Sequence, residues 1–186
     1  GRWVAGVGVR AVCVGVLVGC LLLGLLADRP YAVEPPIPAK VVSTSGQVVF
    51  TGKEISRGQQ VFLGEGLMEY GSIFGHGAYL GPDFTADYLH RAALSARSWY
   101  AGQGASDPRQ QVISDFQANR YNKSTGRLIY SEAQARAFTV LQAHYRDYFG
   151  DPKTDKGLRA NLLTSARDVH DLTAFFSWSA WAASTH

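Results

Sequence analysis

Apolar residues gather near the two ends of the chain, and the pattern between them is that of a water-soluble domain. The first apolar run, at 11–27, reads AVCVGVLVGCLLLGLLA and holds no charged residue. If the aliphatic stem of Arg10 also lies among lipid tails, the run extends back to Val4 and reaches the roughly 20 residues that a membrane-spanning helix needs. The pattern therefore predicts a transmembrane anchor at 1–29.

Charged residues on the two sides of this run predict its orientation. Arg2 and Arg10 lie on the N-terminal side, whereas Asp28 and Arg29 roughly cancel on the other. Because positive charge stays on the cytoplasmic side, we expect the N-terminus in the cytoplasm and the rest of the chain outside. Two other interpretations stay open. One is a cleaved signal peptide, whose apolar core is usually shorter, and the other is a lipoprotein signal, LVGC, ending at Cys20.

The segment that follows, 30–46, is rich in proline and β-branched residues. DRPYAVEPPIPAK, at 28–40, holds four prolines, which fix φ and remove hydrogen-bond donors. We therefore expect an extended, semi-rigid linker. KVVSTSGQVVFTG, at 40–52, places short β-branched runs around a Ser-Thr-Ser-Gly turn, and this predicts a small β-hairpin that starts within the linker segment.

Across most of the region 47–165, apolar residues recur at the intervals that are typical of helices. Four helices are predicted, at 53–66, 85–102, 109–120 and 131–151. Asp83 is placed to cap the second helix, and Pro108 precedes the third. The fourth is the clearest, because Ser131 and Gln134 form a capping-box pattern and apolar residues follow at intervals of three and four. The chain is therefore predicted to be mainly α-helical, with one small hairpin.

A second apolar run begins at Leu172. It contains an aromatic cluster of the kind found where a helix meets the membrane–water boundary: Phe175, Phe176, Trp178 and Trp181. The run is too short to cross a bilayer. We expect 166–186 to be either the start of a second membrane helix or an interfacial helix that docks on a partner.

Charge and motifs exclude several classes of function. The net charge is +3 with a pI of about 8.9, and no long basic run is present, which argues against nucleic-acid binding. Cys13 and Cys20 both lie in the first apolar run, so no disulfide is expected in the rest of the chain. The sequence holds no phosphate-binding loop, dinucleotide fingerprint or G-x-S-x-G motif.

The histidines do not form a recognisable metal motif. They are His76, His90, His144, His170 and His186. No two of them have H-x-x-x-H or H-E-x-x-H spacing, and no cysteine lies near them, so we expect no self-contained transition-metal site. The chain by itself is therefore predicted to be non-catalytic.

Three stretches carry a resemblance to a known family. They are PPIPAKVVSTSGQVVFTGKEISRGQQVF at 35–62, GLMEYGSIFGHGAYLGPDFTADYLHRAA at 66–93 and FFSWSAWAAST at 175–185. In this order and at this spacing they resemble the N-terminal region of quinol-dependent nitric oxide reductases. The resemblance implies that 47–165 is a cytochrome c-like helical domain on the extracytoplasmic side of the membrane.

The same region is similar, more distantly, to the small cytochrome c subunit of cytochrome-dependent nitric oxide reductases. There a C-x-x-C-H segment, which fixes a haem, is followed by a G-x-G-A-Y turn. Aligned on GHGAY, this chain has Leu67 and Tyr70 at the two cysteine positions and Gly71 at the histidine position. Covalent haem needs both thiols and the imidazole. The resemblance therefore implies no covalently bound haem, and we expect Leu67, Met68, Tyr70 and Phe74 to fill the haem space.

The resemblance also implies cofactors and partners. In the quinol-dependent family a large polytopic catalytic portion holds a low-spin haem b, a high-spin haem b and a non-haem iron. It takes electrons from the membrane quinol pool and reduces two NO to N2O and water. This chain would be its non-catalytic subunit or N-terminal module, in the cytoplasmic membrane of a bacterium or archaeon.

A calcium site is implied in the same way. In the cytochrome-dependent relatives, backbone carbonyls of the G-A-Y turn help to hold a calcium ion that is shared with haem propionates of the partner. The matching positions here are Gly77 and Tyr79, and a glycine-rich turn presents carbonyl oxygens without steric hindrance. The alternative, that GHGAYLGP is only a tightly packed turn, stays open.

Other interpretations of the function stay open as well. A related complex, such as an NO dismutase, would use the same scaffold with altered chemistry, and a stand-alone anchored binding module would have no reductase partner. The missing C-x-x-C-H argues against an electron-carrying cytochrome c subunit. Because the family continues from the WAAST stretch into the catalytic bundle, we expect either an enzyme split into two polypeptides or a longer product.

Overall fold

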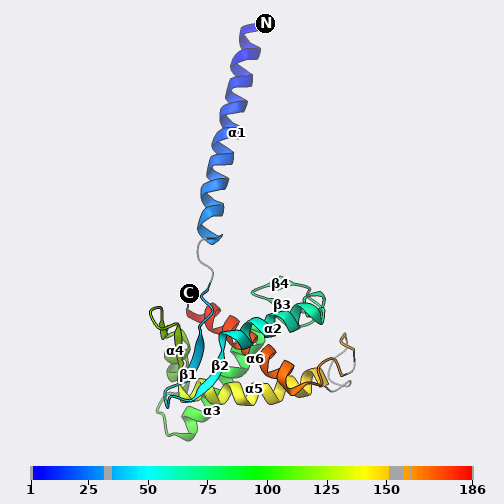
Figure 1. Cartoon of the computed structure of the whole chain (residues 1–186). Coiled ribbons are helices and arrows are strands. Elements are labelled where there is room, and N and C mark those ends of the chain that lie inside the picture. Colours follow the sequence, from blue (N-terminus) through cyan, green and yellow to red (C-terminus); the bar gives the residue numbers. More distant parts are fainter. Residues whose placement is uncertain (1, 32–34, 151–156, 160, 186) are drawn as a thin grey trace. The chain divides into compact units, whose positions relative to one another are not determined.

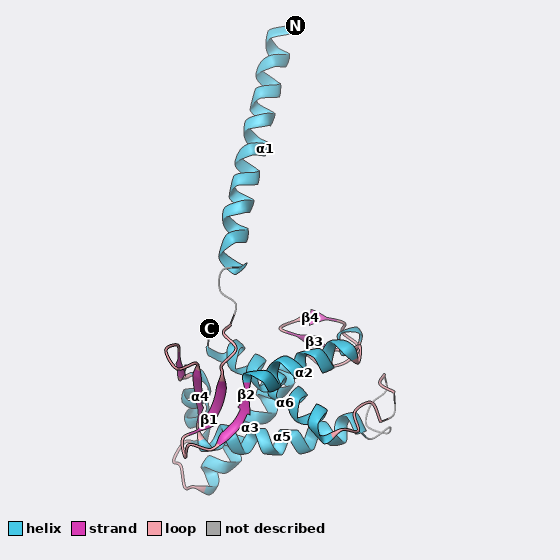
Figure 2. Cartoon of the chain, in the orientation of Figure 1, coloured by secondary structure: helices cyan, strands magenta, loops and turns pink. Residues whose placement is uncertain are grey.

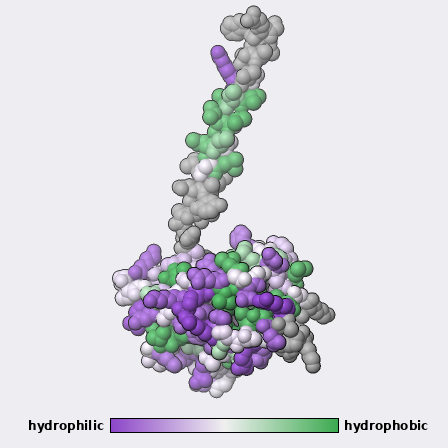
Figure 3. All heavy atoms as spheres, turned by 45° about the vertical axis from the view of Figure 1, so that its right-hand side comes forward, coloured by the Kyte–Doolittle hydropathy of each residue, from purple (hydrophilic) through white to green (hydrophobic). Residues whose placement is uncertain are grey.

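The computed structural model divides the chain into two compact units, 1–36 and 37–186 (Figure 1). The backbone is described for residues 2–31, 35–150, 157–159 and 161–185, and within the first helix the side chains are described at positions 8 and 10–24. The first unit contains one helix, α1, Arg2–Tyr31. Its described side chains are largely apolar, as the upper part of Figure 3 shows.

The predicted anchor coincides with α1. Among the residues that the structure describes, no helix is both long enough and apolar enough to cross a membrane. The anchor predicted at 1–29 depends partly on side chains at 2–7, 9 and 25–29, which lie outside the described residues. A membrane anchor therefore stays a prediction for this segment.

The second unit is mainly helical (Figure 2). Its helices are α2 (Gly52–Gly64), the short 3-10 helix η1 (Leu67–Glu69), α3 (Phe84–Gly102), α4 (Pro108–Gln117), α5 (Glu132–Gly150) and α6 (Ala166–Thr185). The four helices predicted between 53 and 151 are confirmed, with ends that differ by a few residues. Helix α6 contacts α2, α3, α4 and α5, so it is the central helix of the unit.

Local capping explains where these helices begin. The Asp83 carboxylate accepts a hydrogen bond from the Ala86 amide at 2.9 Å at the start of α3. At the start of α5, the Ser131 amide donates to Gln134 Oε1 at 3.0 Å and the Gln134 amide donates to Ser131 Oγ at 3.1 Å. These bonds satisfy amides that have no partner within the helix, and they confirm the predicted caps.

The predicted hairpin belongs to a larger sheet. Strands β1 (Lys40–Ser43) and β2 (Val48–Thr51) pair antiparallel, which confirms the hairpin. On its other side β1 pairs in parallel with β6 (Arg127–Tyr130), and β6 pairs antiparallel with β5 (Tyr121–Asn122), to give the order β2-β1-β6-β5. The sheet therefore joins segments that are almost 90 residues apart, between Lys40 and Arg127, and the sequence patterns did not predict this pairing.

The aromatic tail has a different position from the one expected. The sequence predicts that 166–186 starts a membrane helix or docks on a partner. Within the unit, however, Phe175, Phe176 and Trp181 of α6 are all buried, together with Leu172. The aromatic side chains pack against α2, α3 and α5 of the same unit, so their burial is provided by this chain.

The compact unit is also wider than the predicted domain at 47–165. It runs from Ile37 to His186, because the hairpin and α6 both pack on the remaining elements. A backbone contact fixes the crossing of α2 and α6: a Cβ at Gly58 would overlap the carbonyl oxygen of Asp171. The two helices can approach this closely only because residue 58 lacks a side chain.

Candidate functional site

The segment between α2 and α3 contains the residues aligned with a haem-attachment sequence. Gly66 follows α2 and has a φ of +69°, a conformation that favours glycine. The chain then forms η1 and a short hairpin whose strands, β3 (Ser72–Ile73) and β4 (His76–Gly77), have two residues each. We call residues 66–83 the η1–β4 loop.

The three positions aligned with C-x-x-C-H lie in the interior of the unit. Leu67 is fully buried and Tyr70 is 7 % exposed. The Tyr70 hydroxyl lies 2.9 Å from the Tyr148 hydroxyl of α5, at hydrogen-bonding distance. A Cβ at Gly71 would lie 2.5 Å from the Pro82 carbonyl oxygen and 2.6 Å from a ring carbon of Phe84. The backbone position of Gly71 therefore has no room for an imidazole.

Helix side chains, more than the loop, fill the interior. The expectation that Leu67 and Tyr70 pack inside is confirmed, but it is wrong for Met68 and Phe74, which are 42 % and 39 % exposed. Their places in the interior are taken by rings from four helices: Phe62, Phe84, Tyr145, Phe149 and Phe176. Long aromatic side chains on helices that cross the interior can reach it, whereas Met68 and Phe74 lie on the exposed side of the loop.

The space left between these helices is small. A cavity bounded by Tyr88, Tyr130, Ser177 and Trp181 has a volume of about 20 Å³. A cavity of this size holds about one water molecule. This cavity borders neither Leu67 nor Tyr70. Beside Tyr70 lies an open surface groove of about 470 Å³, which is also lined by Glu69, Leu80 and Arg159.

Hydrogen bonds hold the η1–β4 loop against α3 and α6. The Asp83 carboxylate accepts hydrogen bonds from Ser72 Oγ at 2.8 Å and from the Gly75 amide at 2.7 Å, in addition to its cap on α3. Thr85 Oγ1 accepts from the Phe74 amide at 3.1 Å and donates to Ser179 Oγ at 3.1 Å. The two sides of the hairpin turn are therefore bonded to the start of α3.

The turn at Gly77 requires glycine. Gly77 has a φ of +139°, and a Cβ there would overlap the carbonyl oxygen of Gly71. The Ala78 amide donates to the Met68 carbonyl oxygen at 2.9 Å, which fixes the exit from β4. Tyr79 then lies 86 % exposed and Leu80 81 % exposed. The turn thus combines a constrained backbone with two side chains that extend into solvent.

The implied calcium ion can be tested against this geometry. Calcium takes six to eight oxygen ligands. Gly77 and Tyr79 would supply two backbone carbonyls at an exposed turn. Two carbonyls are fewer than the ligands that calcium takes, so an ion here would need further oxygen atoms, and the calcium site stays a prediction.

A cluster of possible metal ligands among the described residues consists of Glu54, His170 and Asp171, whose ligand atoms lie within 4.8 Å of one another. Arg57 already occupies it: its Nε donates to Asp171 Oδ2 at 2.7 Å and its Nη2 to Asp171 Oδ1 at 3.3 Å. The hydrogen bond to Asp171 raises the pKa of Arg57, so the guanidinium stays charged. A cation would be repelled by Arg57, and the cluster is best described as an ion-pair clamp between α2 and α6.

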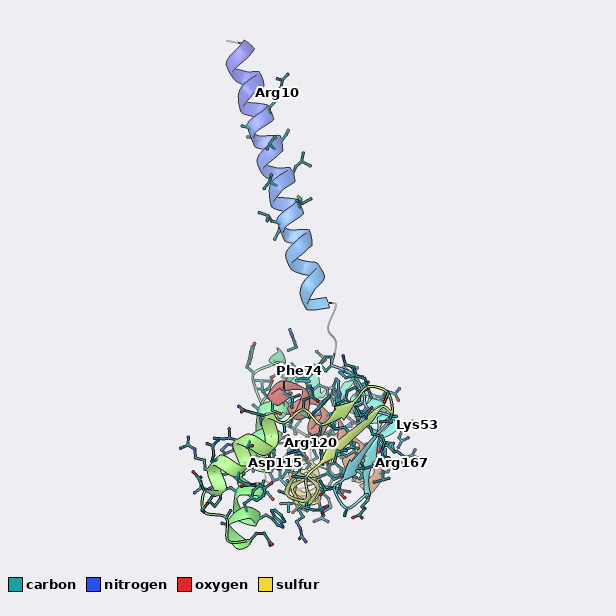
Figure 4. All side chains as sticks on the ribbon, turned by 90° about the vertical axis from the view of Figure 1, so that its left-hand side faces the viewer. Arg10, Lys53, Phe74, Asp115, Arg120 and Arg167 are labelled. Atoms are coloured by element: carbon teal, nitrogen blue, oxygen red, sulfur yellow. The ribbon has the colours of Figure 1, made fainter. Side chains whose placement is uncertain are left out.

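A second polar cluster surrounds Asp115 of α4, which is 6 % exposed. Its carboxylate accepts hydrogen bonds from Tyr100 at 2.9 Å, from Ser131 Oγ at 2.6 Å and from Arg120 at 2.5 Å. Asp115 and Arg120 are labelled in Figure 4. The cluster joins α3, α4 and the start of α5. No local pattern indicated it, because its members are brought together by tertiary contacts.

Comparison with known proteins gives one family. A family model for the cytochrome c-like domain of the nitric oxide reductase protein NorB matches residues 38–186. The matched segment coincides with the second compact unit, 37–186, almost residue for residue. A search of curated proteins gave no match.

Proposed function

The chain belongs to the family of the NorB cytochrome c-like domain of nitric oxide reductase, and we propose that it is the haem-less, non-catalytic module of a quinol-dependent nitric oxide reductase. The observation that carries this proposal is the packing at Leu67, Tyr70 and Gly71. Two of these side chains fill the interior, and the third position abuts Pro82 and Phe84. Neither thiols nor an imidazole are available where a c-type haem would be fixed.

This packing supports a particular route for electrons. A domain without covalent haem has no redox group to accept electrons from a soluble cytochrome. We therefore propose that electrons enter from a membrane quinol, directly into a polytopic catalytic portion with b-type haems and a non-haem iron. That portion combines two NO, two electrons and two protons into N2O and one water. The module itself would contribute scaffold and position.

Localisation and the calcium site belong to the same proposal. The apolar run at 11–27 would anchor the module in the cytoplasmic membrane, with 37–186 on the extracytoplasmic side. The backbone carbonyls of Gly77 and Tyr79 would hold one side of a calcium ion shared with the catalytic portion. When bound, calcium would supply positive charge beside the partner's anionic groups. Gly77 would orient the turn toward the calcium ion.

The test is quinol-driven turnover by whatever purifies with this chain. Native membranes would be solubilised in mild detergent, and the full chain would be isolated with its partners. We expect extractable haem b and NO consumption that depends on a reduced quinol and yields N2O. Consumption supported only by a reduced cytochrome c, or release of O2 and N2 in place of N2O, would contradict the proposal.

A further inference from the structure

The cavity of about 20 Å³ in the second unit has a polar wall. Its lining includes residues of α3, α5 and α6 and the last residue of β6, and it includes no residue of the η1–β4 loop. The cavity is therefore separate from the segment aligned with a haem-attachment sequence and from the turn at Gly77. Several buried side chains in its wall carry polar groups: Tyr88, Tyr130, Gln134 and Ser177.

Three hydroxyl groups of this wall are bonded to one another, and we call Tyr88, Tyr130 and Ser177 the hydroxyl cluster. The Tyr130 hydroxyl lies 2.9 Å from Ser177 Oγ and donates to the Ser177 carbonyl oxygen at 3.3 Å. Tyr88 is hydrogen-bonded to the same Ser177 side chain, and burial raises the pKa of both tyrosines, so their hydroxyls keep their protons. Because a hydroxyl has one proton and two lone pairs, the cluster can accept a bond from a further donor.

Gln134 of α5 adds a donor to the same wall. Its Oε1 accepts hydrogen bonds from the Arg120 guanidinium at 3.3 Å and from the Ser131 amide at 3.0 Å, which identifies the oxygen end of the side-chain amide. The other end, Nε2, has no hydrogen-bond acceptor among the residues that the structure describes. Gln134 is only 8 % exposed, and a buried amide nitrogen without an acceptor is costly in free energy. An acceptor within the cavity would remove this cost.

Size and chemistry together identify the ligand. A cavity needs roughly 10–15 Å³ of this kind of volume to hold one water molecule, and the water needs two to four polar partners. The cavity meets both conditions. Cavities that stay dry are lined by apolar groups, and this wall is not. An ion does not fit either, because no charged side chain is among the described residues that line the cavity.

From these observations we infer that the cavity is a binding site for one structural water molecule. The water accepts a hydrogen bond from Gln134 Nε2 and donates to an oxygen of the hydroxyl cluster. Because Gln134 also bonds Arg120, and Arg120 bonds Asp115, the water connects the polar cluster around Asp115 with the hydroxyl cluster. It thereby links α4 and α5 to α3 and α6 within the core. The inference is independent of the proposed function, since it concerns the interior of this chain alone.

The first experiment locates the water directly. Crystals of the full chain, grown in detergent and diffracting to a resolution that shows ordered water, are expected to contain a single peak in the cavity. The peak should lie about 2.7–3.2 Å from Gln134 Nε2 and from an oxygen of the hydroxyl cluster. Xenon pressure distinguishes a hydrated cavity from a dry one, and no xenon should bind here. A cavity that binds xenon, or one without the peak, would overturn the inference.

A double-mutant cycle tests the connection between Gln134 and Tyr130, which share no direct hydrogen bond in the described part of the chain. Tyr130→Phe removes one hydroxyl, and Gln134→Met removes the amide with little change in volume. If the water connects the two side chains, Tyr130→Phe should change the unfolding equilibrium constant less in the Gln134→Met background, by a factor of about three or more. Denaturant titrations of the full chain in detergent measure both effects.

Ser179→Ala is the matched control for the cycle. Ser179 is, like Ser177, a buried serine of α6, but its hydroxyl accepts from Thr85 Oγ1 at 3.1 Å and donates to the Phe176 carbonyl oxygen at 2.9 Å, outside the cavity wall. Its effect should be the same in both backgrounds. Equal effects of Tyr130→Phe in the two backgrounds would overturn the inference. A reduced effect of Tyr130→Phe, together with an unchanged effect of Ser179→Ala and the ordered peak, supports it.

Discussion

The ring of Phe84, at the start of α3, stacks on the ring of Phe176, in the middle of α6, with centroids 4.6 Å apart and planes inclined by 2°. Both rings are fully buried, and Tyr145 and Phe62 pack around them. The pair lies behind the η1–β4 loop, where Phe84 also contacts the position of Gly71. Aromatic residues of the helices thus fill the interior beside Gly71, one of the positions aligned with the haem-attachment sequence.

Restoring the attachment residues should therefore not restore a haem. We predict that Leu67→Cys with Tyr70→Cys and Gly71→His, expressed with a c-type haem maturation system, gains no covalent haem. The imidazole at position 71 would collide with Pro82 and Phe84. Gly71→His alone should lower the free energy of unfolding by about 3 kcal/mol, at the upper end of overpacking effects. Haem staining and denaturant unfolding measure the two results, and a covalent haem in the triple variant would contradict the account.

The stacked pair predicts a large effect of truncation. Phe176→Ala should reduce the free energy of unfolding by about 3–5 kcal/mol, because it removes a fully buried ring and leaves a cavity. Val140→Ala on exposed α5 surface should change it by less than about 0.5 kcal/mol. Equal effects of the two variants in a denaturant titration would show that α6 is not the centre of this core.

The crossing of α2 and α6 gives a matched pair of glycine variants. Gly58→Ala should destabilise the unit by about 2 kcal/mol or more, because the added methyl would overlap the Asp171 carbonyl and separate the helices. Gly64→Ala, at the end of the same helix and in open space, should be neutral or should stabilise by up to about 1 kcal/mol. Thermal unfolding compares them, and a stable Gly58→Ala chain would argue against this close crossing.

The parts of this fold that were predictable from the sequence are those encoded locally. Ser131 and Gln134 are three residues apart, and their reciprocal bonds require only a helix start, so the pattern predicted α5 correctly. Asp83 was recognisable as a cap for the same reason. Its further bonds to Ser72 and Gly75 were not, because they depend on how the loop folds back.

The features that the sequence did not predict depend on contacts between residues that are far apart along the chain. The strand at Arg127–Tyr130 is short, and it is stabilised by a parallel partner at Lys40–Ser43 that no local pattern reveals. The aromatic residues of α6 suggested a membrane boundary, since hydrophobicity alone does not distinguish lipid from a protein core. Phe74 was placed inside by its type. Its φ of +52° and its bond to Thr85 instead hold the ring at the surface against Trp178.

The turn at Gly77 predicts a specific effect on the partner. Gly77→Val should strain the hairpin and lower the haem b retained by the complex, because its φ of +139° and the contact with Gly71 exclude a side chain. Gly75→Asn is the control, since its φ of +75° is one that asparagine tolerates and nothing surrounds it. A calcium chelator should lower haem retention in the wild type. Unchanged haem content and turnover in Gly77→Val would argue against the calcium turn.

Tyr100 predicts a dependence of stability on alkaline pH. Burial, followed by the hydrogen bond to Asp115, raises the pKa of Tyr100 from 10.0 to about 12. Between these values the unfolded chain loses the phenol proton while the folded chain keeps it, so stability should fall as pH rises from 10 toward 12. Tyr100→Phe should make this fall less steep. Unfolding titrations at several pH values test this, and identical slopes for wild type and Tyr100→Phe would contradict it.

The most direct test of the central claim is the intact mass of this chain, measured together with a reduced-minus-oxidised spectrum of the complex from native membranes. The account predicts a polypeptide mass without added haem, together with a b-type spectrum from haem that is extracted into acidified solvent with the partner. A chain that carries covalent haem would contradict the filled interior at Leu67, Tyr70 and Gly71. A chain with no haem-containing partner would contradict its place in a nitric oxide reductase.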